Sequence, residues 1–149
     1  MLQIIRKFLL FFFVCCFPIL SYCCDKPQEL AVNSVKHLLE KNYDKIIENV
    51  YLPDSIIGNK DLTDKFKEEK IEFLKMKRED DVDFMRISEN GGMDEIIVEK
   101  NENNEEIHYL NEERTEARIK VTIICKNGYK QTSGVKLILQ NGKWKLYIG

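Results

Sequence analysis

The spacing of apolar residues changes once along this chain, near Asp81, and that change decides the fold class. Before Asp81 the apolar residues recur every three or four positions, as on amphipathic helices. After it they alternate with polar residues, as on strands that have one buried face. Helices followed by an antiparallel sheet make an α+β protein. A chain of 149 residues has room for one core, so we expect a single α+β domain at 25–149 behind a separate segment, 1–24.

Three helices are predicted in the first half of that domain. Pro27 suits the first position of the first helix, which should end near Asn42. A short second helix begins at Tyr43, and Pro53 prevents it from continuing. The third is expected over about 62–77.

Strands are predicted over 81–88, 93–100 and 105–110, and the third should pair back on the second. Asn90-Gly91-Gly92 is a turn between the first two. The clearest half-buried strand alternates five apolar residues with polar ones: Ala117, Ile119, Val121, Ile123 and Cys125.

The register of the last hairpin follows from its turn. Asn141-Gly142 favours a two-residue type I′ turn, which sets Leu139 opposite Trp144 and Leu137 opposite Leu146, with Val135 opposite Ile148. Each apolar pair then shares a face, and Trp144 is expected to anchor the core.

The preceding hairpin needs a longer turn. A two-residue loop at Asn127-Gly128 would place apolar residues of one strand opposite polar residues of the other. A three-residue loop, 126–128, with a bulge at Gly128 sets Ile123 opposite Gln131 and Ile119 opposite Val135. We therefore predict the bulged turn.

The segment 1–24 has the layout of a secretory signal. Arg6 and Lys7 precede an uncharged apolar run over 8–20, and no acid occurs before Asp25. The run is shorter than the roughly 20 residues that span a bilayer. An uncleaved membrane anchor is the alternative.

The end of this segment suggests lipid attachment. Leu20-Ser21-Tyr22-Cys23 resembles the lipobox of bacterial lipoproteins, although Tyr22 stands where that motif has a small residue. We expect Cys23 to carry the lipid, with Cys24 as the alternative and simple cleavage as a second one. The chain would then be anchored at the bacterial cell envelope, or be soluble in the periplasm or secreted if no lipid is added.

Charge argues against a nucleic-acid partner. All 25 acids lie after residue 24 and two of the 23 bases lie before it, which leaves the exported part near −4. The lysines of 60–78 are interleaved with acids, as on a solvated helix face. Phosphate binding instead needs clustered bases.

The pattern as a whole resembles a known fold. The residues that carry the resemblance are a helical hairpin with Asn42-Tyr43-Asp44-Lys45 at its bend, Gly91-Gly92-Met93, 115–121, Asn127-Gly128 and the closing Asn141 to Leu146. Together they are similar to the nuclear transport factor 2-like, or cystatin-like, fold, and more narrowly to the bacterial lipoproteins of domain of unknown function 4878. The resemblance implies a curved sheet around a conical cavity, and pairing of two copies through the sheet. Members of this fold include both enzymes and binding proteins.

No set of residues with recognisable catalytic or metal-binding spacing emerges. His37 and His108 are the only histidines, and neither has zinc-ligand spacing. We expect Cys125 to be a small buried hydrophobe, and 80–83 to be a solvated connection from helix to strand. The resemblance implies that Tyr43 packs and Asp44 caps at the helix bend. No cofactor and no metal are predicted.

The polar exceptions on the predicted cavity face are Tyr129, Gln131 and Ser133, and none of them is a base near neutral pH. The function expected is therefore non-catalytic: the domain holds a small apolar ligand, or an envelope protein. The alternatives are a small isomerase or dehydratase of the same fold, and a purely interacting immunity or assembly factor.

Overall fold

A computed structural model describes residues 26–149 of the chain. The predicted signal segment, with Cys23 and Cys24, lies outside these residues. The four helices that the structure describes are α2 (Pro27–Leu39), α3 (Tyr43–Ile47), α4 (Lys60–Asp80) and α5 (Val82–Glu89). The first three confirm the predicted helices, and Pro27 stands at the start of α2. Asn59 caps α4 by accepting a hydrogen bond from the backbone nitrogen of Leu62.

The strand predicted over 81–88 is wrong, because that segment forms helix α5. Asp81 caps its first turn, with Oδ1 accepting from the nitrogen of Asp83 at 2.9 Å. At its other end Gly91, with φ of 87°, and Gly92 donate to the carbonyls of Ser88 and Ile87. That pair of bonds is a Schellman motif, so the predicted turn at 90–92 ends a helix instead of joining two strands.

The sheet is antiparallel, and its strands lie in the order β1-β3-β4-β5, with β2 also paired to β3. The central two are the longest. The strands are β1 (Met93–Val98), β2 (His108–Tyr109), β3 (Glu116–Cys125), β4 (Lys130–Gln140) and β5 (Lys143–Leu146).

Both predicted hairpin registers are confirmed. Ile119 pairs with Val135 and Ile123 with Gln131, and Gly128 takes a positive φ of 86° in the three-residue loop. In the last hairpin Leu139 pairs with Trp144 and Leu137 with Leu146. β5 ends at Leu146, so the ladder does not reach the predicted pair of Val135 with Ile148.

The segment 105–110 departs from its prediction. Within it only His108 and Tyr109 form a strand, and they pair with Arg118 and Ala117 of β3 instead of with β1. β1 pairs with 121–125 of the same strand, so β1 and β2 share one edge of β3. The polar loop between them, 99–107, is long enough to carry the chain along that edge.

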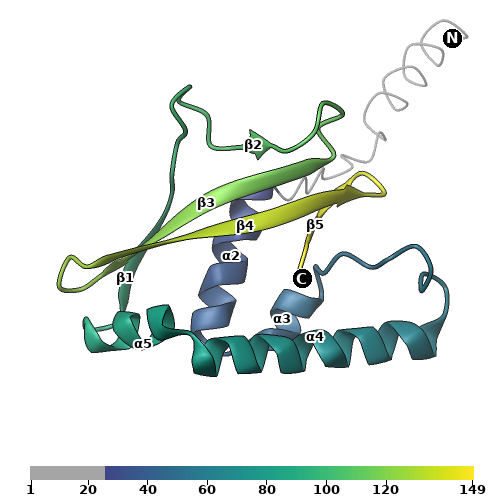
Figure 1. Cartoon of the computed structure of the whole chain (residues 1–149), viewed down its shortest axis with the longest axis horizontal. Coiled ribbons are helices and arrows are strands. Elements are labelled where there is room, and N and C mark those ends of the chain that lie inside the picture. The colour runs from purple at the N-terminus through teal and green to yellow at the C-terminus, as the bar shows by residue number, and fades with distance from the viewer. Residues whose placement is uncertain (1–25) are drawn as a thin grey trace, which may run out of the picture.

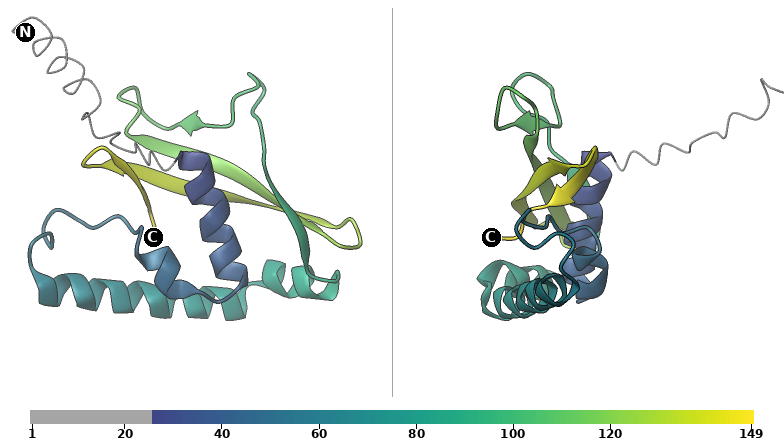
Figure 2. Two further views of the ribbon diagram at one scale, coloured as in Figure 1. Left: turned by 180° about the vertical axis from the view of Figure 1, so that it is seen from behind. Right: turned by 90° about the vertical axis from the view of Figure 1, so that its right-hand side faces the viewer.

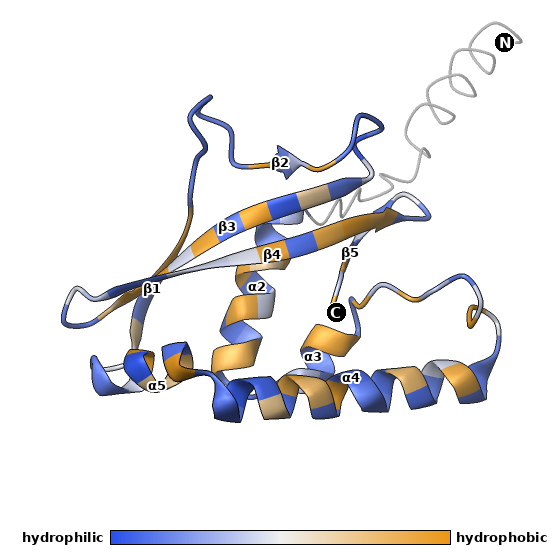
Figure 3. Cartoon of the chain, in the orientation of Figure 1, coloured by the Kyte–Doolittle hydropathy of each residue, from blue (hydrophilic) through white to orange (hydrophobic). Residues whose placement is uncertain are grey.

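One face of the sheet is covered by helix, and the other is not. α2 crosses behind β3 and β4 in Figure 1 and in front of them in the reverse view of Figure 2, and it contacts β1, β3, β4 and β5. Alternating apolar and polar residues along β3 and β4 are visible in Figure 3. The apolar set lies against α2, and Ala117, Ile119, Val121 and Leu137 are fully buried. Within 26–149, no helix combines the length and the apolar character needed to cross a membrane.

Candidate functional site

An apolar hollow lies between the sheet and helix α4. Its lining residues come from β4, α4 and α2, and in Figure 1 β4 lies above α4 while α2 passes behind β4. We call it the cleft. Its volume is about 180 Å³, and it is open to solvent on one side. It is lined by Ser34, Val35, Leu38, Ile46, Phe73, Leu74, Lys77, Asp81, Phe84, Ser133, Gly134, Val135, Lys136 and 146–149.

The walls of the cleft are aliphatic and aromatic, because each element turns its apolar side toward it. Val35 and Leu38 belong to the stripe of α2, and Phe73 and Leu74 to that of α4. Val135 comes from the buried face of β4. A small ligand that entered here would leave water for an apolar surface, which is favourable.

Two cations stand at the rim of the cleft over aromatic rings. Lys77 Nζ lies 5.9 Å from the ring centre of Phe73, and Lys136 Nζ lies 4.7 Å from that of Tyr147. Lys136 also forms an ion pair with Glu116, at 2.8 Å. Cations over rings keep their charge in water while their stems cover apolar surface. The rim is therefore polar although the walls are not.

Asp81 is the carboxylate among the lining residues, and it already has a structural role. Its Oδ1 caps α5 through the nitrogen of Asp83. The predicted solvated connection at 80–83 is wrong: Asp80 ends α4, Val82 and Asp83 begin α5, and Asp81 alone joins the two helices. A capping carboxylate is held by the helix that it caps, which limits its use as a mobile base.

The three polar residues predicted to face the cavity are separated in the structure. Ser133 lines the cleft, whereas Tyr129 and Gln131 are not among the lining residues. Tyr129 donates from its hydroxyl to Oε1 of Gln131 at 3.1 Å, and Gln131 donates from Nε2 to Oδ2 of Asp83 at 2.9 Å. Those two side chains thus join the sheet to α5.

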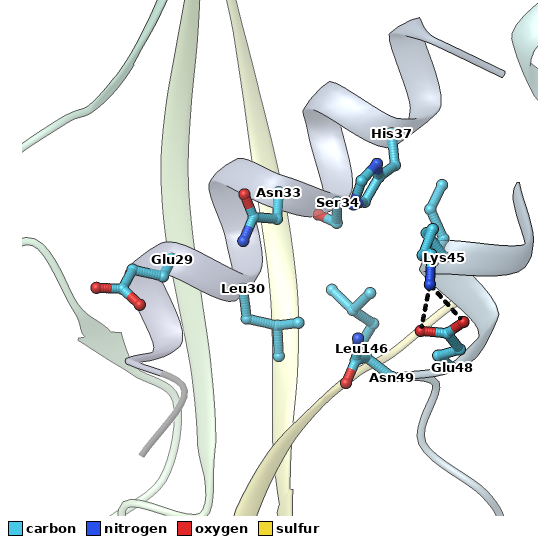
Figure 4. Close-up of a pocket in the computed structure, with 10 residues that line it drawn as sticks. Glu29, Leu30, Asn33, Ser34, His37, Lys45, Glu48, Asn49 and Leu146 are labelled. Carbon is cyan, nitrogen blue, oxygen red and sulfur yellow. Dashed lines mark hydrogen bonds and ion pairs between the residues drawn. The ribbon is translucent and has the colours of Figure 1, made fainter. Parts of the chain in front are cut away.

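A second hollow, the slot, lies between α2 and α3 and is drawn in Figure 4. Its volume is about 170 Å³. Ser34, Ile46 and Leu146 line both the slot and the cleft, so the two hollows are separated by these side chains. The slot is more polar, since its walls carry the ion pair of Lys45 with Glu48 at 3.0 Å.

His37 lines the slot, not the cleft. Its Nδ1 is buried and has no hydrogen-bond partner among residues 26–149, and Oε2 of Glu40 is 3.6 Å away. The other histidine, His108, is exposed at the opposite end of the fold. The structure therefore does not bring the two histidines together.

The remaining residues of interest have structural positions. Cys125 is 1% exposed, and its Sγ lies 3.9 Å from the carbonyl oxygen of Ile87, as expected for a small buried hydrophobe. Tyr43 packs against the core, as predicted. Asp44 lies in the first turn of α3, but no side-chain hydrogen bond caps this helix, so its predicted capping role is not found. Trp144 is half-buried opposite Leu139, also against the core.

Sequence reasoning did not identify Phe73, Phe84, Lys77 or the end of the chain as cleft residues. Phe73 was visible as part of an apolar helix face, but no local pattern shows that this face leaves space below β4. Phe84 was assigned to a strand. The missing information is the position of α4 and α5 relative to the sheet, which depends on long-range packing.

A search of the solved structures gives a match that fixes the fold. It is a chain from Campylobacter jejuni described as a "Putative NTF2-like transpeptidase", with a TM-score of 0.57 and 21% sequence identity. The match covers 83% of this chain and 99% of that one. No family model matches the sequence, and no curated protein does. Helices packed on a strongly curled antiparallel sheet, with this match, show that the fold is α+β and nuclear transport factor 2-like.

Proposed function

We propose that this chain is a binding protein that holds a small apolar or amphipathic ligand in the cleft, without catalysing a reaction on it. The observation that carries the proposal is the apolar wall made by Val35, Phe73 and Val135 beneath an open mouth. Binding sites for small molecules are concave, mostly apolar and provided with a few polar groups at defined places. The cleft has that composition, with Lys77, Ser133 and Lys136 as its polar groups.

The size of the cleft restricts the ligand. A volume of about 180 Å³ is smaller than the roughly 300–1,000 Å³ of a pocket that encloses a drug-sized ligand. It suits a ring or a short acyl chain, and the rest of a longer ligand would extend past the rim. The cations over Phe73 and Tyr147 would then lie beside the part that remains in water.

Catalysis is the alternative, and the structural roles of the lining groups weigh against it. An enzyme of this fold needs an acid or a histidine that is free to take a proton inside the cavity. Asp81 caps α5, and Lys136 is paired with Glu116. His37, whose Nδ1 lacks a partner in 26–149, opens on the slot.

Export and lipid attachment at Cys23 are part of the proposal, and so is kinship with the lipoproteins of domain of unknown function 4878. Their support is the sequence pattern of 1–24 and the residues named for the resemblance. The word transpeptidase describes the Campylobacter protein, and at 21% identity the match carries the fold alone. An interaction partner at the envelope is the further alternative.

The test is ligand retention by native mass spectrometry of the protein purified from its own envelope. We expect retained small-molecule mass in the wild type and its loss in Ser133→Trp, which fills the cleft from β4. Lys130→Trp is the matched control, because it places the same ring on the same strand but on the opposite face. Equal retention by all three proteins would show that the ligand lies elsewhere, and a co-purifying protein in place of a ligand would support the interaction alternative. Catalytic turnover of the retained molecule that Asp81→Asn abolishes would overturn the non-catalytic assignment.

A further inference from the structure

Charge is distributed very unevenly along the chain. Residues 26–115 carry 14 bases and 23 acids, whereas residues 116–149 carry seven bases and a single acid, Glu116. Residues 26–149 as a whole are acidic, so their net charge conceals a strongly basic C-terminal quarter. That quarter forms β3, β4 and β5.

The register places six of those seven bases on one face of the sheet. Residues paired across antiparallel strands share a face, and alternate residues of a strand share it too. Arg118 pairs with Lys136, and Lys145 pairs with Ile138 next to it. The bases that lie on this face, opposite to the buried Ala117 and Ile119, are Arg118, Lys120, Lys130, Lys136, Lys143 and Lys145.

This basic face is the side of the sheet that α2 does not cover, and it is turned toward the viewer in Figure 1. Arg118, Lys120, Lys130 and Lys143 are exposed, and the other two are half-buried. Within 26–149, Lys136 is the member with an ion pair, to Glu116 at 2.8 Å. Glu95 and Glu99 lie toward the β1 edge, and Glu99, Glu105 and Glu106 line one hollow with Arg118 and Lys120. The excess of bases is therefore concentrated over β4 and β5.

Gly134 on β4 leaves room for the side chain of Arg118. A Cβ atom placed there would lie 3.3 Å from Cδ of Arg118, which is tighter than most contacts of a Cβ atom. The stem of Arg118 therefore lies over the bare backbone of β4.

We propose that the basic face lies against an anionic phospholipid surface. The positive charge of the face is complementary to the negative charge of the phosphate headgroups. Its lysines are spread across the sheet, so each of them can contact a different headgroup on one surface. Each base near such a surface contributes favourably, and the attraction falls off within about 10 Å.

The start of the described chain is the N-terminal end of α2, which packs on the opposite face of the sheet and reaches its β2 edge. Gln28 in the first turn of α2 donates from Nε2 to Oε2 of Glu106 at 3.1 Å. Glu106 and the basic-face residues Arg118 and Lys120 line one hollow. Only Cys24 and Asp25 separate Cys23 from Lys26, so an anchor at Cys23 would hold this edge within about 10 Å of the bilayer. The distance of this edge from the bilayer depends on the predicted anchor at Cys23. The charge of the basic face depends neither on that anchor nor on a ligand in the cleft.

The test compares the full chain on two kinds of vesicle, phosphatidylcholine alone and phosphatidylcholine containing phosphatidylglycerol. The N-terminal segment contributes to binding on both, so the ratio of the two partition coefficients reports the electrostatic part. Changing Lys130, Lys143 and Lys145 to Gln should lower that ratio by about fivefold per lysine, or about a hundredfold in all at low salt. Added salt should lower the wild-type ratio toward one.

The matched control changes three exposed lysines on α2 and α4 to Gln: Lys36, Lys60 and Lys65. It alters the net charge equally, and we expect it to leave the ratio within about twofold of the wild type, since only charges near the surface contribute. Melting temperatures of both triple variants show whether they are folded. An unchanged ratio in the basic-face variant, or an equal loss in the control, would overturn the proposal. So would tight binding to polyglutamate or DNA without vesicles that depends on the same three lysines, because the partner would then be an acidic polymer.

Discussion

Gln131 on β4 donates a hydrogen bond from Nε2 to Oδ2 of Asp83 on α5, across 2.9 Å. Tyr129 donates to the other end of the same amide, at 3.1 Å. The two bonds fix the amide orientation and connect the far end of the β3–β4 hairpin to a helix 48 positions earlier in the chain.

Gln131→Leu should therefore loosen α5. It removes a partly buried hydrogen bond to a carboxylate, which contributes about 1–2 kcal/mol when the acceptor is charged but partly solvated. We expect a loss of that size in the free energy of unfolding, measured by urea denaturation. Lys130→Leu, one residue earlier on the opposite face, is the control and should cost less than about 0.5 kcal/mol. Equal losses would mean that the bond to Asp83 contributes nothing.

The faces of β3 can be tested at two adjacent residues. Val121 is fully buried, whereas Lys120 is exposed on the basic face. Val121→Asp should destabilise by roughly 3–5 kcal/mol, because it buries an unpaired carboxylate, and Lys120→Asp by less than about 1 kcal/mol. Thermal unfolding followed by circular dichroism separates these values. Similar melting temperatures for the two variants would show that the assigned faces are wrong.

Gly128 tests the bulged turn. Its φ of 86° is in the left-handed region, and a Cβ atom placed there would meet no other atom within 4 Å. The cost of Gly128→Ala is therefore conformational alone, about 1–2 kcal/mol of stability. Gly128→Asn should cost less, since Asn tolerates this region better. Chemical denaturation of both variants would show the order, and a reversed order would argue against the left-handed turn.

Lipid attachment remains a prediction about residues outside those the structure describes. We expect incorporation of radiolabelled palmitate in the wild type and none in Cys23→Ala, because the lipobox cysteine is the acceptor. Cys24→Ala should stay labelled. Equal labelling of all three, or none in any, would refute attachment at Cys23, and dependence on Cys24 alone would move the site by one residue.

The hairpin registers could be predicted from the sequence because they depend on local information. Asn141-Gly142 sets a turn type, and a slip of one residue would turn Ile119, Val121 and Ile123 into water. Two independent constraints, turn chemistry and burial, thus agree on one answer. The same argument places the bases on a single face, although the overall acidity of the chain had suggested no basic surface at all.

The α5 helix could not be identified by period, because eight residues are too few. Phe84 and Ile87 face inward at helical spacing, but Val82 and Met85 are about half exposed, at 51% and 49%. That mixture suits a strand equally well. The informative signals were at its ends, where Asp81 caps the first turn and two glycines cap the last.

The cleft could not be predicted from the sequence, for a different reason. It is the space left between β4 and α4, and its size depends on how α4 packs against α3. Ser133 was predicted to face the cavity because alternate residues of β4 lie on the same face. Phe73 and Lys77 were not predicted to line it, because the helical pattern of α4 does not show which element lies opposite.

The last strand of the sheet is shorter than its neighbour. β5 ends at Leu146, opposite Leu137, and among residues 26–149 no further strand pairs with 130–135 of β4 on that side. An unpaired strand edge is a template for the edge of another copy, and charged side chains, lysines above all, discourage such growth. Lys130 begins this stretch and Lys136 follows it. We therefore expect these two lysines to oppose edge-to-edge joining of copies at high protein concentration.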